Sequence, residues 1–168
     1  IVVMVFVTSR LVWLWLSLDT SMYWEESYRW IAALEILKHP IQPLFDYQAD
    51  HYQGGSLCMI LLAVGLLRIF GESILVMKLS ALLISTATLC GLYVLGRRVF
   101  GRSTAVVAAL AYIAGPPLVA YWGLVVMGSH GESILFSLLQ FLIFFEILSG
   151  DWRTPWSWAV FGFVSGLG

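Results

Sequence analysis

The chain has 168 residues, of which 60% are hydrophobic and only 11% are charged, and its mean hydropathy is +0.89. A soluble domain of this length cannot bury so much apolar surface, so the composition indicates an integral membrane protein. The formal net charge of −1, without a basic stripe, argues against a nucleic-acid partner. Eight Trp and seven Tyr residues are typical of the aromatic belts at bilayer interfaces.

The first predicted membrane span covers residues 1–18, close to the ~20 residues that a bilayer core requires. Arg10 is its only charge, and we expect this side chain to face the bundle interior or to reach an interface. No charged segment or small-residue cleavage site precedes the span, so it is not interpreted as a signal peptide. Because both ends of the chain are apolar, we expect residues 1–168 to be the N-terminal part of a larger transmembrane domain.

The polar stretch that follows contains a helical periodicity at 22–38, which predicts an amphipathic helix lying along the membrane surface. The expected apolar face consists of Tyr23, Trp30, Leu34 and Leu37. Glu25 and Arg29 lie on the other side and are expected to face water. Pro40 and Pro43 should end the helix, since proline lacks the backbone donor and disfavours helix before it.

The next apolar segment, 56–70, is short for a span and contains Arg68. If it crosses the membrane, the basic run GRRVFGR at 96–102 lies on the same side as the acidic loop at 19–53. If it lies in the interface, that run lies on the opposite side. The excess of arginine in a short loop favours a cytoplasmic position, so we predict that 56–70 is interfacial.

Further spans are then predicted at 74–95, 103–121, 133–148 and 156–168, with a short outer loop at 128–132. The tripeptide GPP at 115–117 should kink or break its span. The predicted fold class is therefore all-α, a multipass transmembrane helical bundle with interfacial amphipathic helices in a first outer loop at 19–73.

Glu25 and Glu26 are adjacent carboxylates just after the first span. The simple interpretation is structural, because acids favour the first turn of a helix and Glu25 can pair with Arg29 four residues later. His51 and His130 can likewise be ordinary polar loop residues. No HExxH or comparable ligand cluster is present, so the sequence supports no metal and leaves the cofactor, including a divalent metal, open.

Several short motifs occur together in this region: WEE at 24–26, ILKHP at 36–40, YQGGSL at 52–57 and LLRIFG at 66–71. This succession resembles the first outer loop of polyprenyl-phosphate-sugar glycosyltransferases with the C-type fold. It is more narrowly similar to the superfamily of protein mannosyltransferases and lipid A aminoarabinose transferases (family 39). The run LGRRVFGR at 95–102 is similar to an inner turn of that family, and MGSHGE at 127–132 is similar to one of its outer loops.

In that family an Asp-Glu pair after the first span lies at the active site, and the aspartate is the catalytic base. The resemblance implies that Glu25 occupies the aspartate position and Glu26 the glutamate position, so this chain carries glutamate where the family has aspartate. Asp19 is an alternative base on the same side of the first span. The implied reaction is inverting transfer of a sugar to an acceptor hydroxyl on the extracytoplasmic side of the plasma (inner) membrane.

Such a transfer needs a base for the acceptor hydroxyl and cations or donors for the departing phosphate. The substrate-binding candidates in the outer loops are Arg29, Lys38, His51, Tyr52, Gly54, Gly55, His130 and Glu132. Gly54 and Gly55 would allow the backbone to approach a lipid phosphate closely. The expected partners are a polyprenyl-phosphate-linked sugar, membrane lipid, and a glycan, lipid or protein acceptor. The fragment alone is expected to be inactive.

Two other classes of protein stay open. A transporter or channel subunit would use ionisable residues within spans and broken helices, for which Arg10, Lys78, Glu146 and the GPP break at 115–117 are candidates. Lys78 and Glu146 lie near the ends of their segments, however, where a long side chain can reach the interface. The second alternative is a non-catalytic membrane protein with the same fold.

Overall fold

The computed structural model describes residues 2–17, 24–39, 57–126 and 128–167, and these form eight α-helices without a β-strand. The helices are α1 (Val2–Leu16), α2 (Trp24–Lys38), α3 (Leu57–Phe70), α4 (Ile74–Phe100), α5 (Arg102–Ile113), α6 (Pro117–Trp122), α7 (Gly128–Ser149) and α8 (Pro155–Leu167). The predicted all-helical class is therefore confirmed for this part of the chain.

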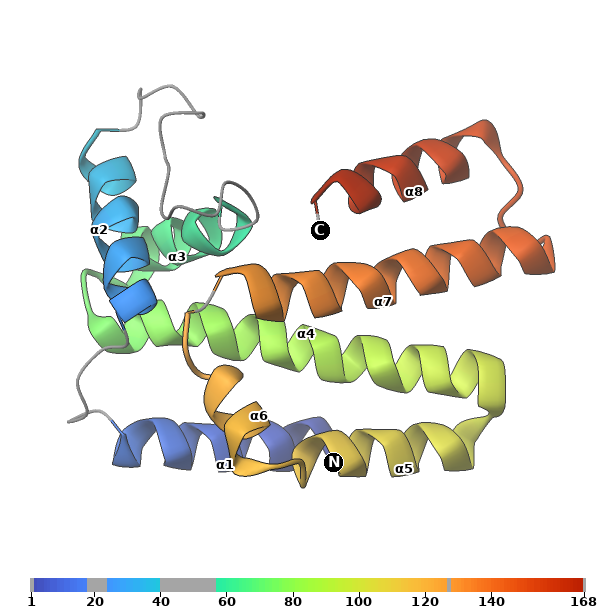
Figure 1. The fold of residues 1–168 in the computed structure, drawn as a ribbon, viewed down its shortest axis with the longest axis horizontal. Coiled ribbons are helices and arrows are strands. Elements are labelled where there is room, and N and C mark those ends of the chain that lie inside the picture. The colour runs from blue at the N-terminus through green and yellow to red at the C-terminus, as the bar shows by residue number, and fades with distance from the viewer. Residues whose placement is uncertain (1, 18–23, 40–56, 127, 168) are drawn as a thin grey trace.

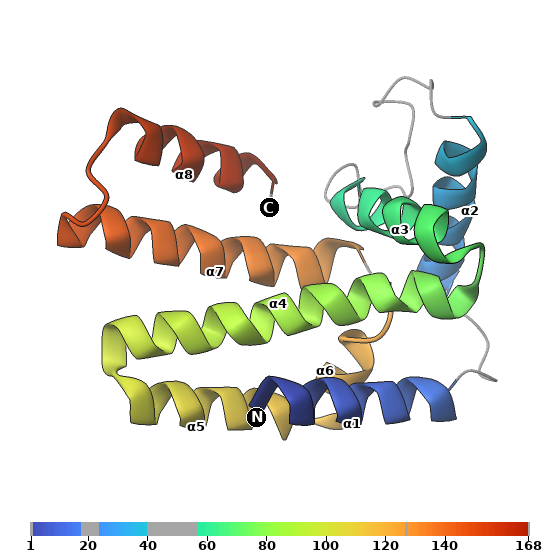
Figure 2. The ribbon, with the colours of Figure 1, turned by 180° about the vertical axis from the view of Figure 1, so that it is seen from behind.

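Five helices run roughly parallel to one axis, namely α1, α4, α5, α7 and α8, with α1 and α5 largely end to end along one edge (Figures 1 and 2). Helix α2 lies across one end of this bundle, and α3 lies at the same end beside the first turns of α4 (Figures 1 and 2). The end of α4 and the start of α5, which carry the basic run at 96–102, lie at the opposite end. The polar helix α2 and the basic run are thus separated by the length of the bundle.

The turn between α4 and α5 depends on two glycines. Gly101 has a φ of +90°, a left-handed conformation that side chains with a Cβ rarely adopt. A Cβ at Gly96 would lie 3.1 Å from Cα of Ala105, so the hydrogen of glycine permits close packing of the two helices. The two apolar cores lie on either side of α4, one with α2 and α3 and the other with α1 and α5.

The predicted span at 103–121 is divided into α5 and α6, with the break at residues 114–116. Pro117 has no N–H, so it cannot donate to the carbonyl of Ile113 as a continuous helix would require. Nη2 of Arg10 donates a hydrogen bond to this carbonyl oxygen at 3.3 Å. Arg10 is buried, as the first of its two expected positions required, and its guanidinium lies 5.0 Å from the ring centroid of Phe6. The guanidinium of Arg10 therefore supplies the donor that the helix break removes from the carbonyl of Ile113, and this carbonyl in turn gives the buried cation a partner.

The expected outer loop at 128–132 is wrong, because α7 already begins at Gly128. Two of the described helices are long and apolar enough to cross a membrane, namely α4 and the segment His130–Ser149 of α7. Helices α1, α3 and α5 are apolar but shorter.

Candidate active site

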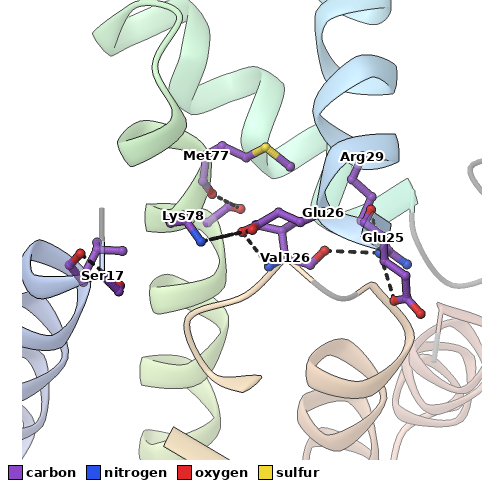
Figure 3. Close-up of polar contacts among 9 residues, drawn as sticks. Ser17, Glu25, Glu26, Arg29, Met77, Lys78 and Val126 are labelled. Carbon is purple, nitrogen blue, oxygen red and sulfur yellow. Dashed lines mark hydrogen bonds and ion pairs between the residues drawn. The ribbon is translucent and has the colours of Figure 1, made fainter. Parts of the chain in front are cut away.

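The expectation that the charged side of α2 faces water is wrong, although Trp30 and Leu37 of the expected apolar face do pack against the core. Its buried face carries Glu26 and Arg29 together with small and aliphatic residues, whereas Trp24, Tyr28 and Ile31 are exposed. The reason is that α2 packs on polar groups of α4 and of the segment before α7, which attract its charged side chains inward (Figure 3). Residues 26 and 29 are three apart and therefore share this face.

Glu26 is held by an ion pair that joins α2 to α4. Nζ of Lys78 lies 3.0 Å from each carboxylate oxygen of Glu26, and the Glu26 side chain is only 1% exposed (Figure 3). The Lys78 side chain is 10% exposed, so the expectation that it reaches an interface is wrong. A charge so deeply buried requires an opposite charge at hydrogen-bonding distance, and each residue supplies the other's.

The backbone of Val126 connects this pair to the segment that leads into α7. Its N–H donates to Oε1 of Glu26 at 3.4 Å, and its carbonyl oxygen accepts from Nη1 of Arg29 at 3.2 Å (Figure 3). Two side chains of α2 thus hold both backbone polar groups of Val126. As a result, the start of α7 is fixed against the start of α2.

Glu25 is less enclosed than its neighbour. One carboxylate oxygen lies 3.3 Å from Nη1 of Arg29, and the Glu25 side chain is 19% exposed, compared with 5% for Arg29. The predicted pairing of these two residues at i,i+4 is confirmed. The two adjacent carboxylates therefore differ in environment, since Glu26 is sealed in an ion pair and Glu25 remains accessible beside a cation.

Glu132 lies in the second turn of α7 and is buried. The backbone of Met59 in α3 approaches its carboxylate, but neither carboxylate oxygen has a well-formed hydrogen bond within the part of the chain that the structure describes. The charge of Arg29 acts on this carboxylate, which places Glu132 within electrostatic reach of the Glu25 and Arg29 pair. A buried carboxylate without a well-formed hydrogen bond is costly, and such groups mark functional sites in membrane proteins.

His130 is exposed and stacks on Trp122, with ring centroids 5.8 Å apart and planes inclined by 20°. Both rings line a cavity of about 170 Å³ between α4 and the segments around α6 and α7. Ligand pockets usually measure ~300–1,000 Å³, so this cavity is too small for a lipid-linked sugar. It has room for a side chain or a few water molecules.

The structure brings Glu25, Glu26, Arg29 and Glu132 to one end of the bundle. Lys38 does not join them, because twelve residues of helix separate it from Glu26, or ~18 Å at 1.5 Å per residue. Asp19, His51, Tyr52, Gly54 and Gly55 lie outside the described residues. Among the residues that are described, no group of three or more His, Cys, Asp or Glu side chains is placed to hold a metal ion.

Sequence reasoning missed the partners of the α2 carboxylates. The signal for Lys78 was a lone lysine five residues into an apolar helix, which the prediction assigned to an interface. The role of Val126 left no signal, because it depends on backbone groups.

The chain matches no protein-family model, and no curated protein or solved structure shows significant similarity to it. Arguments about function therefore depend on the residues and their geometry.

Proposed function

We propose that the protein is a multipass membrane glycosyltransferase that transfers a sugar from a polyprenyl-phosphate donor to an acceptor hydroxyl, with inversion at the anomeric carbon. The observation that carries this proposal is the division of labour between two adjacent carboxylates on α2. Glu26 is neutralised by Lys78 in a buried ion pair. Glu25 is partly exposed beside Arg29 and is therefore accessible to a substrate. A general base must contact the acceptor hydroxyl, so the accessible Glu25 suits this role better than the buried Glu26.

Membrane insertion is supported by the apolar surface that the bundle leaves uncovered. Only 22% of the most apolar 18-residue stretch of α7 is buried, whereas the core helix of a soluble protein is mostly enclosed. Trp15 and Phe163 are 72% and 68% exposed on α1 and α8. Surfaces of this kind suit lipid. The arginines at 97, 98 and 102 then favour a cytoplasmic position for their end of the bundle, with α2 on the extracytoplasmic side.

In the proposed reaction, Glu25 accepts the proton of the acceptor hydroxyl as the hydroxyl oxygen forms its bond to the anomeric carbon. The bond from that carbon to the phosphate oxygen breaks, and the electron pair leaves with the polyprenyl phosphate. Arg29, 3.3 Å from Glu25, is a fixed cation beside the reacting groups and opposes the negative charge of the leaving phosphate. Glu132 is proposed to adjust the position and field of Arg29.

The three ionisable residues give the transporter alternative less weight, although the break between α5 and α6 is compatible with it. Arg10 is accounted for by the carbonyl of Ile113, and Lys78 by Glu26. Glu146 pairs with Arg98, 2.9 Å away, at the basic end of the bundle. All three candidate ionisable residues therefore have structural partners.

The test is release of polyprenyl phosphate by the full-length protein in membranes supplied with radiolabelled polyprenyl-phosphate hexoses and pentoses. Glu25→Gln should lower the rate ~10²–10⁴-fold, the usual contribution of a general base. Glu35→Gln is the matched control, because Glu35 is an exposed glutamate on the same helix. Equal rates for wild type and Glu25→Gln would show that Glu25 is not the base.

A further inference from the structure

A second site is suggested at the opposite end of the bundle, where the chain turns from α7 into α8. An open groove of about 600 Å³ lies there. Its lining residues are Ile147, Leu148, Arg153, Thr154, Pro155 and Trp158. Most of this lining is apolar, and the guanidinium of Arg153 is its charge. The turn between α7 and α8, whose residues line this groove, lies at the same end of the bundle as the turn between α4 and α5 (Figures 1 and 2).

Arg153 is held in place by the end of α7. Its Nε donates to the carbonyl oxygen of Ile147 at 3.3 Å, and its Nη2 donates to that of Leu148 at 3.2 Å. Gly150, with a φ of +87°, lets the chain turn back, and a Cβ there would lie 3.6 Å from Nε of Arg153. A cation at the carboxyl end of a helix also complements the helix dipole. The guanidinium is therefore ordered before any ligand arrives.

The other wall of the groove is equally defined. The N–H of Ser157 donates to Oγ1 of Thr154 at 3.3 Å, and the N–H of Thr154 donates to Oγ of Ser157 at 3.4 Å. This reciprocal cap starts α8, with Pro155 in the first helical position. The entry into α8 is thus fixed next to Arg153.

The charges around the groove leave an excess of positive charge. Arg98 binds Glu146 at 2.9 Å and also pairs with Asp151, so one arginine engages both acids of this end. Four arginines, at 97, 98, 102 and 153, face two acids, which leaves a local charge of +2. A guanidinium has five N–H groups, and the described residues accept from two of those on Arg153. Three remain available to a ligand.

We propose that this groove binds an anionic phospholipid, with the headgroup phosphate on Arg153 and an acyl chain along Leu148 and Trp158. The chemistry of the groove requires a ligand that is anionic at one end and apolar at the other. Basic pockets between helices on the cytoplasmic side bind anionic headgroups in this way, and the cytoplasmic leaflet is rich in such lipids. Trp156 and Trp158, 76% and 55% exposed beside the groove, suit the same interface. The site is separate from the proposed catalytic residues, and only its cytoplasmic position rests on the membrane orientation proposed above.

The experiment is native mass spectrometry of the full-length protein in detergent, titrated with phosphatidylglycerol or with phosphatidylcholine of identical acyl chains. Wild-type protein should bind phosphatidylglycerol more tightly. Arg153→Gln should weaken that binding about fivefold, the equivalent of ~1 kcal/mol per cation near a headgroup. Arg102→Gln, which removes the same charge from an exposed position outside the groove, should change it less than twofold.

A second variant guards against a folding defect at Arg153, because that residue also caps α7. Trp158→Ala leaves the cap intact and should weaken both lipids, since it removes part of the apolar wall. If Arg153→Gln and Arg102→Gln weaken phosphatidylglycerol binding equally, the proposed site is wrong and the lipid is attracted only by the overall positive charge of this end. Equal binding of the two lipids would also overturn it. So would a photo-crosslinker at position 158 that captures a protein segment, of this chain or of a second copy, instead of lipid.

Discussion

The ion pair between Glu26 and Lys78 offers the sharpest test of the structure. Lys78→Met keeps an unbranched side chain of similar length but removes the charge. The carboxylate of Glu26 then stays 1% exposed, with the N–H of Val126, 3.4 Å from Oε1, as its remaining donor among the described residues. An unpaired buried charge loses its attraction and still bears its desolvation cost.

The magnitude follows from the distance. Two unit charges 3.0 Å apart attract by ~5 kcal/mol at an effective dielectric constant of 20. Desolvation opposes this attraction while both partners are present, and removal of one partner from a buried pair costs ~3–5 kcal/mol. We therefore expect Lys78→Met to lower the free energy of unfolding by about that amount. The double variant Glu26→Gln, Lys78→Met should regain most of it, because no buried charge remains.

The assay is reversible unfolding in mixed micelles, followed by tryptophan fluorescence. Arg98→Met is the matched control, since Arg98 forms an ion pair between helices in which the side chains are 45% and 33% exposed. Exposed pairs contribute ~0–1 kcal/mol, so this variant should remain near wild type. If Lys78→Met costs no more than Arg98→Met, or if the double variant is as unstable as the single one, the buried pair does not exist.

Three further predictions concern the site, the packing and the topology. Glu132→Gln should keep or raise thermal stability, because it replaces a buried carboxylate that lacks a well-formed hydrogen bond with a neutral amide of the same shape, yet lower sugar transfer; a loss of stability would show that the carboxylate stabilises the fold. Gly96→Leu should cost ~1–3 kcal/mol of unfolding free energy because its side chain meets Ala105, whereas Gly162→Leu, in open space, should cost little. In a cysteine-free background, Val99→Cys should react with an impermeant maleimide only after permeabilisation; labelling in intact cells would reverse the proposed orientation.

Local patterns were sufficient for much of the fold. The apolar segments became helices because length and hydropathy are properties of the segments themselves. The GPP break at 115–117 was also predictable, since proline cannot donate the backbone hydrogen bond. The pair of Glu25 and Arg29 followed from helical spacing alone.

The predictions that failed concerned which side of α2 is buried and where α7 begins. On α2, Trp30 and Leu37 pack against the core as expected of the apolar face, but Arg29 is buried instead of facing water. The helical periodicity of α2 alone carries no information about partners such as Lys78, fifty-two residues from Glu26. The start of α7 was predicted too late, because the polar and glycine-rich sequence GSHGE at 128–132 is typical of a turn. The sequence gives no sign that Glu26 and Arg29 of α2 bind the backbone of Val126, just before this helix. Both errors arise from contacts between segments that are distant in sequence.

By itself, then, the sequence determined that the chain is helical and apolar, and which short segments carry its charges, because composition and periodicity are local properties. Only the tertiary structure decided what those charges do. It buried Glu26 against Lys78, left Glu25 accessible beside Arg29, and enclosed Glu132 without a well-formed hydrogen bond among the described residues. The physical reason is that the environment of a charge depends on burial and on partners from other helices, and packing alone assembles these.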